Sequence, residues 1–111
     1  MSGKAAVDRE RRQIEERAHF ETARANVLEG RLTLVGNDYQ RAGALFGQAV
    51  TELETLQRML RELSQAELAG RIEIVVSNAK AAQSAAAAQN ANAWSAADAA
   101  LQALKGIRIP E

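Results

Sequence analysis

The chain has 111 residues, which suits one small domain, with 14 Lys and Arg against 14 Asp and Glu and no cysteine. This balance, with only 4% aromatic residues, argues against nucleic-acid binding, which favours a basic face and stacking side chains. The sequence has no disulfide or thiolate site and no apolar run that could cross a membrane, and its first twelve residues lack the apolar core of a signal peptide. We therefore expect a cytoplasmic protein, or a periplasmic one if an upstream anchor has been removed.

Helix-forming residues dominate, and the only proline is Pro110, so the chain is predicted to be all-α. The expected architecture is a set of antiparallel helical hairpins. We divide it into a charged helical extension over residues 1–17, a hairpin domain over residues 18–106 and a C-terminal tail over residues 107–111.

The first predicted helix, over residues 5–35, carries two apolar stripes at helical spacing. The continuous stripe consists of Ala18, Ala25, Leu28, Leu32 and Val35. A second stripe beside it consists of Phe20, Ala23, Val27 and Leu34. Two adjacent stripes indicate a helix that touches more than one neighbour.

A break at residues 36–38 separates this helix from a second one, over residues 39–63. Gly36 suits the left-handed position after a helix end, and Asn37 or Asp38 can cap the next helix. Such a short loop predicts an antiparallel hairpin. The second helix has the clearest stripe and should dominate the core. Its members are Tyr39, Ala42, Phe46, Ala49, Leu53, Leu56, Leu60 and Leu63.

The third helix, over residues 65–88, is predicted to begin at a capping box formed by Ser64 and Glu67. Its stripe loses bulk along the chain, from leucine and isoleucine to alanine. The members are Leu68, Ile72, Val75, Val76, Ala79, Ala82 and Ala86.

The fourth helix, over residues 93–105, follows a break in which Asn90 or Asn92 can act as the cap, and Gly106 closes it. Alanine-lined helices bury little area, so the second hairpin should be the less stable half unless a partner covers it.

The run Asp38-Tyr39-Gln40-Arg41-Ala42, followed by Phe46 and Ala49, resembles the second helix of a tetratricopeptide repeat. Gly30 falls where the first helix of such a repeat carries a small residue against its partner. The resemblance implies stacked hairpins that bind a peptide or protein. However, Ala42 and the matching Ala97 are 55 residues apart, against a family period of about 34. A plain antiparallel four-helix bundle explains the same periodicities, and both architectures stay open.

No catalytic motif can be assembled, and we expect neither enzymatic activity nor a cofactor. His19 is the only histidine and has no second E-x-x-H motif to complete a metal site, so we expect it to be solvated. The carboxylates of the first helix are expected to form a charged, solvated face. They are Asp8, Glu10, Glu15, Glu16, Glu21 and Glu29.

The candidate interface has three parts. Gly43 and Gly47 are one turn apart and favour close helix approach, within the domain or across a dimer. Trp94 could line a binding groove or plug a hairpin end. The exposed side of the third and fourth helices, near Ile74, Ala81 and Ala85, is predicted to contact another chain.

We predict a non-enzymatic module for protein–protein interaction or scaffolding. The alternative is a dimerisation domain of a larger protein, which could be anchored to a membrane. The expected partner is a protein or peptide, or a second copy of the chain in a homodimer, and not nucleic acid or a membrane. A peptide would be expected in a groove lined by the first and third helices.

Overall fold

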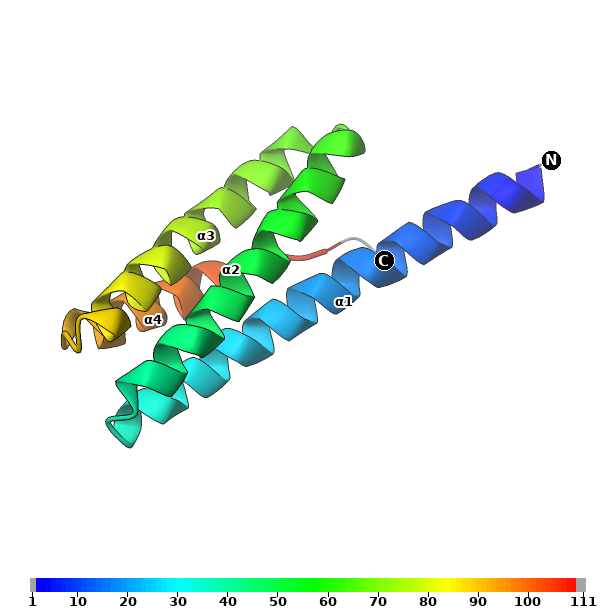
Figure 1. The fold of residues 1–111 in the computed structure, drawn as a ribbon. Coiled ribbons are helices and arrows are strands. Elements are labelled where there is room, and N and C mark those ends of the chain that lie inside the picture. The colour runs from blue at the N-terminus through cyan, green and yellow to red at the C-terminus, as the bar shows by residue number, and fades with distance from the viewer. Residues whose placement is uncertain (1, 110–111) are drawn as a thin grey trace.

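Four helices alternate in direction along one long axis (Figure 1). The computed structural model describes residues 2–109, with side chains from Val7 onward. The helices are α1 (Ser2–Val35), α2 (Tyr39–Glu62), α3 (Ala66–Ala87) and α4 (Asn92–Lys105). No strand occurs between residues 2 and 109, so the all-α prediction is confirmed.

The helices form a closed ring of neighbours. α1 packs against α2 and α4, and α3 packs against the same two helices. This is the arrangement of an antiparallel four-helix bundle, one of the two architectures left open by the sequence. The molecule measures 54 × 21 × 18 Å. The 34 residues of α1 span about 51 Å, so this helix sets the long axis and extends past the others at its N-terminal end (Figure 1).

α2 supplies the largest part of the core, as its stripe predicts. Every member from Ala42 to Leu60 is buried, whereas Tyr39 is half-buried and Leu63 is exposed at the two ends. The α3 stripe is buried from Ile72 to Ala86. Because α2 and α3 each have one clear apolar stripe, the sequence predicts which face of each helix turns toward the core.

α1 buries only the second of its two stripes. The core stripe, as we call it, comprises Phe20, Ala23, Val27, Gly30 and Leu34, all buried. The continuous stripe, which starts at Ala18, faces solvent on the opposite side of the helix, so the prediction that the two stripes are adjacent and both touch neighbours in the fold is wrong. The core stripe includes Gly30, whose missing side chain makes room for the ring of Phe46. That close fit favours this face of α1 turning inward.

The three hairpin turns share one geometry. A residue with positive φ lies in the turn after each of α1, α2 and α3. These residues are Asn37, Ser64 and Gln89, at φ of 60°, 60° and 53°. In each turn this residue donates its backbone N–H to the carbonyl three residues back, and the next residue donates to the carbonyl five back. This is the Schellman motif, made here without glycine at its left-handed position.

Two predictions about these turns are therefore wrong. Gly36 does not take the left-handed position, because Asn37, one residue later, does. Ser64 does not open a capping box, since it closes α2, and Gln65 caps α3 without a side-chain bond. The cap of α2 is as predicted, because Asp38 Oδ1 accepts from the backbone N–H of Arg41 at 3.1 Å.

After α4 the chain turns back toward α1 (Figure 1). Ile107 is buried in the core, and Ile109 packs partly against it. Together with Phe20 they border a shallow cavity along α1. Residues 107–109 lie outside any helix, and Ile107 and Ile109 add to the packing of the core. The rest of the predicted tail, residues 110–111, lies outside the described residues.

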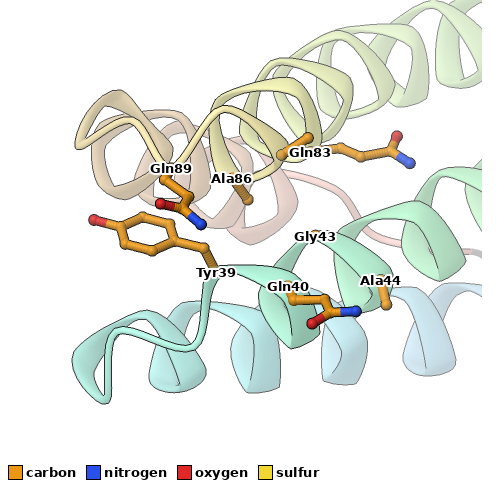
Figure 2. Close-up of a pocket in the computed structure, with 8 residues that line it drawn as sticks. Tyr39, Gln40, Gly43, Ala44, Gln83, Ala86 and Gln89 are labelled. Atoms are coloured by element: carbon orange, nitrogen blue, oxygen red, sulfur yellow. The ribbon is translucent and has the colours of Figure 1, made fainter.

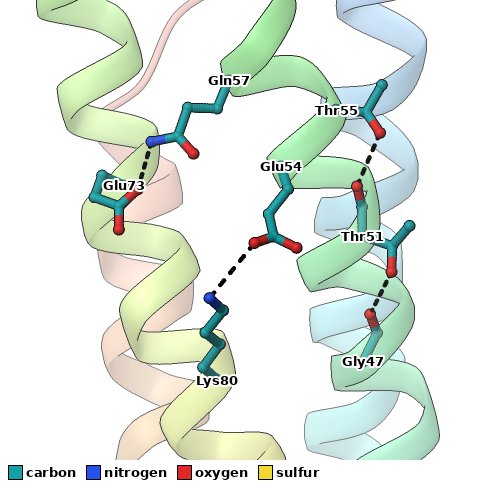
Figure 3. A network of polar contacts seen from close by, with 7 residues as sticks. All are labelled: Gly47, Thr51, Glu54, Thr55, Gln57, Glu73 and Lys80. Carbon is teal, nitrogen blue, oxygen red and sulfur yellow. Dashed lines mark hydrogen bonds and ion pairs between the residues drawn. The ribbon is translucent and has the colours of Figure 1, made fainter.

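Polar contacts hold α2 against α3 (Figure 3). The buried Gln57 donates from Nε2 to the Glu73 carboxylate at 2.5 Å and to the Ala69 carbonyl at 3.3 Å. Lys80 Nζ lies 3.4 Å from Glu54 Oε2. The exposed ion pair adds little to stability, whereas the buried amide must keep its partners and so fixes the register of the two helices.

Candidate interaction surfaces

A groove of about 460 Å³ opens between the start of α2 and the end of α3 (Figure 2). It is lined by Tyr39, Gln40, Gly43, Ala44, Gln83, Ala86, Ala87 and Gln89. Tyr39 lies beside Gln89 at one end of the groove. None of these eight residues is charged, so the groove offers amide and phenol hydrogen bonds but no general base.

The position of this groove corrects one prediction. We expected a peptide site between the first and third helices. α1 and α3 instead occupy opposite corners of the ring, since each packs against α2 and α4. The groove between α2 and α3 exists because α2 presents glycine to an alanine-rich stretch of α3.

Gly43 and Gly47 both face α3, inside the domain. A Cβ built on Gly43 would lie 3.6 Å from the Cβ of Ala86, and one on Gly47 would lie 2.8 Å from Nε2 of Gln83. The predicted close approach of helices is therefore present within one chain. These glycines compensate for the small side chains of α3, because they let the two backbones come together.

Trp94 is half-buried and packs against the core from α4. The guanidinium of Arg31 lies 4.3 Å from its ring centroid, and Arg31 Nε donates to Asp98 at 2.7 Å. A cation over an indole face adds about 0.5–1 kcal/mol at such a partly exposed site. Trp94 therefore packs α4 against α1. Of the two roles that the sequence left open, this is the closing of a hairpin end and not the lining of a binding groove.

The remaining candidates lie along α3. Ile74 is 58% exposed, Ala81 is exposed, and Ala85 is half-buried against the core. Ile74 and Ala81 stand on the outer side of α3, as predicted, and their contact with another chain stays a prediction.

The largest display of apolar side chains lies on α1. Among the described residues, seven large hydrophobic side chains are exposed, and five of them belong to this helix. They are Val7, Ile14, Leu28, Leu32 and Val35. With the exposed Ala18 and Ala25, they form what we call the exposed stripe. The sequence pattern revealed most of this stripe but not its exposure, which depends on the fit of Gly30 to Phe46.

His19 is not simply solvated, which corrects that prediction. Its Nδ1 lies 2.5 Å from Oε2 of Glu52, and the two half-buried side chains join α1 to α2. A second ion pair on the same helix pair links Arg12 to Glu62 at 3.1 Å. No cluster of three or more potential metal ligands was found in the described part of the chain.

Glu16 is the exception among the carboxylates of α1, since it is only 1% exposed. Its Oε1 atom has no hydrogen-bond partner, and neither has Nε of Arg12 beside it. Burial raises the pKa of Glu16, and the positive charge of Arg12 offsets part of that rise. The sequence held a signal for this, because Glu16 precedes Phe20 by four residues and so continues the core stripe.

No described helix combines the length and the hydropathy that a membrane span requires. The resemblance to tetratricopeptide hairpins stays a prediction. No family model matches the chain, and no match was found among the curated proteins or the solved structures.

Proposed function

We propose that this protein is a non-enzymatic helical module for protein–protein interaction or scaffolding, and that it docks through the exposed stripe of α1. The observation that carries the proposal is the exposure of Leu32 (69%), Val35 (61%) and Leu28 (43%) along one face of a helix whose opposite face is buried. Scattered apolar residues on a surface are ordinary, whereas an uninterrupted apolar line, such as the stripe over residues 25–35, is typical of an interaction site.

The rest of the surface supports the same choice. Outside α1, the only exposed large apolar side chains among the described residues are Leu63, at the end of α2, and Ile74 on α3. The accessible surface is 6655 Å², whereas a compact monomer of 12.0 kDa exposes roughly 6,000 Å². The molecule is therefore less compact than a typical monomer of its mass, in line with the N-terminal end of α1 projecting past the other helices (Figure 1).

Site-specific photo-cross-linking tests the proposal. A photoreactive amino acid is placed at Leu32 on the exposed stripe, at Ile74 on α3, or at Gln102 on α4 as the control. All three positions are exposed, so none should disturb the fold. Irradiation in the producing cells should give discrete protein adducts from position 32 in clear excess over position 102.

The same experiment separates the two candidate surfaces. Adducts from position 74 and not from position 32 would favour the surface near Ile74, Ala81 and Ala85 and reject the α1 stripe. Equal yields at positions 32 and 102 would contradict a specific docking face on α1 altogether.

A further inference from the structure

We infer that the exposed stripe of α1 is a seam for a second copy of this chain, with the two α1 helices parallel and in register over residues 25–35. The inference rests on the proposed docking role of α1 and names the occupant.

The first argument is the spacing of the stripe. Val7, Ile14, Leu28 and Val35 fall at multiples of seven residues, and Ala18, Ala25 and Leu32 form a second seven-residue series offset by four. Alternating steps of four and three residues are the mark of a coiled-coil seam, with each apolar side chain inserted between four residues of a facing helix. A buried stripe of the same kind occupies the opposite face of α1, so the helix is built to pack on both sides.

The second argument is the charge beside the seam, which selects both the occupant and its direction. Arg24 and Glu29, both exposed, flank Ala25 and Leu28 on opposite sides of the stripe. In a parallel pair, the residue before one seam position faces the residue five further along the other helix. Arg24 of each copy then faces Glu29 of the other, which makes two symmetric ion pairs. Within its own chain, Oε1 of Glu29 lies 3.0 Å from the guanidinium of Arg41.

The antiparallel alternative places like charges together. Pairing the same apolar segments in opposite directions brings Glu29 toward Glu29 across the seam, and this repulsion costs energy. The flanking charges of α1 therefore match a parallel copy of α1 itself.

The seam has a defined beginning. Glu21 interrupts the exposed stripe, and Arg11 interrupts it again nearer the N-terminus. In a parallel pair each would face its own copy, and Glu10 would face Glu15 of the other chain. The apolar contact therefore covers residues 25–35, and the helices diverge toward their N-terminal ends. A contact this small predicts a transient dimer in rapid equilibrium with the monomer.

Cysteine cross-linking tests this arrangement directly, because the chain has no cysteine of its own. In the parallel pair the two copies of Val35 lie opposite each other, so Val35→Cys should form a disulfide-linked dimer under mild oxidation. Ile74→Cys is the matched control, since Ile74 is an apolar residue of similar exposure at 58% against 61%. We expect Val35→Cys to cross-link at least tenfold faster than the control at equal concentration.

The cross-linking rate of a charge-reversal variant provides a second test. Arg24→Glu in the Val35→Cys background places a carboxylate opposite Glu29 and should slow cross-linking severalfold, while circular dichroism stays unchanged. Cross-linking of Ile74→Cys at the same rate as Val35→Cys would overturn the inference. So would a wild-type dimer in sedimentation whose Val35→Cys form does not cross-link, because that dimer would not be parallel.

Failure of this inference can be told apart from failure of the proposed function. If Val35→Cys stays monomeric while position 32 cross-links to a different protein in cells, the docking role of α1 stands and the second copy is rejected.

Discussion

Gly30 and Gly70 offer a sharp test of the packing between α1 and α2. Both are glycines inside helices, where alanine is ordinarily more stable by about 1 kcal/mol. A Cβ on Gly70 meets nothing within 4 Å. A Cβ on Gly30 would lie 2.7, 3.0 and 3.1 Å from three carbon atoms of the Phe46 ring. Phe46 is completely buried, so the ring has little room to move away.

The two substitutions are expected to change the free energy of unfolding in opposite directions. Gly70→Ala should stabilise the protein by about 1 kcal/mol, the helix-propensity gain alone. At Gly30 the same gain is set against overpacking, which costs about 1–3 kcal/mol in a well-packed core. Gly30→Ala should therefore be destabilising by up to about 2 kcal/mol. Since 1 kcal/mol shifts the Tm of a domain this small by about 4–8 °C, the two variants should melt on opposite sides of the wild type.

Thermal melts followed by circular dichroism, with urea titrations for the free energy of unfolding, measure both variants. Phe46→Leu supplies the decisive control, because it removes the ring edge that Gly30 accommodates. On that background Gly30→Ala should be nearly neutral or stabilising, which gives a coupling energy of about 1–3 kcal/mol between the two sites. If Gly30→Ala raises the Tm as much as Gly70→Ala does, the ring does not sit on Gly30 and the inward face of α1 is misassigned.

Three further measurements probe other parts of the fold. Burial raises the pKa of Glu16 above its ordinary value of 4.5, so the folded state binds the proton of this carboxyl group more tightly than the unfolded state does. The free energy of unfolding, compared with that of a Glu16→Gln variant, should therefore rise as the pH falls from neutral and level off below about 4.5. Glu16→Gln itself should stabilise the protein at pH 7 by about 1 kcal/mol, and a loss of stability in urea titrations at pH 7 would contradict this. Ile107→Ala should cost about 2–3 kcal/mol, since Ile107 is buried in the core, whereas the exposed Ile74→Ala should stay within about 0.5 kcal/mol of the wild type; equal losses would mean that the tail does not pack. Ser64→Gly should gain about 1 kcal/mol by relieving the positive φ, while Ser77→Gly inside α3 should lose about 0.5 kcal/mol, since serine is an intermediate helix former. A loss at both positions would argue against the left-handed turn.

The helices and their ends could be predicted because local features decide them. The spacing of apolar residues predicted α2 and α3, and the cap at Asp38 lies where the sequence placed it. The expected cap of α4 was wrong, because its N-cap is Ala91, without a side-chain bond, while Asn90 Oδ1 accepts from the backbone N–H of Asn92 at the start of the helix. The turns were harder to assign, since left-handed geometry fell on Asn37, one residue past the glycine that usually adopts it. A one-residue difference of this kind depends on the hydrogen bonds of the whole turn and not on the preference of one residue.

The orientation of α1 could not be predicted for a different reason. Its two stripes have the same spacing, and both are apolar, so periodicity alone gives no preference between them. The choice depends on shape across two helices, namely a glycine at position 30 opposite an aromatic ring at position 46. Glu16 follows from the same choice, because burying the core stripe carries this carboxylate inward as well.

The second hairpin, which the sequence predicts to be the less stable half, shows how the fold compensates for small side chains. Ala79, Ala82 and Ala86 on α3 contribute little apolar area each, and the expected loss of stability would follow if the helices kept ordinary spacing. Gly43 and Gly47 instead let α2 approach this stretch closely, while Arg31 and Trp94 fasten α4 to α1. Ile107 then covers the side that the short α4 leaves open. The alanine-lined helices thus gain packing from within the chain itself, and a partner over α3 stays a prediction. The exposed stripe of α1 carries five of the seven exposed large apolar side chains among the described residues, so it is the surface whose apolar exposure most needs a partner to explain it.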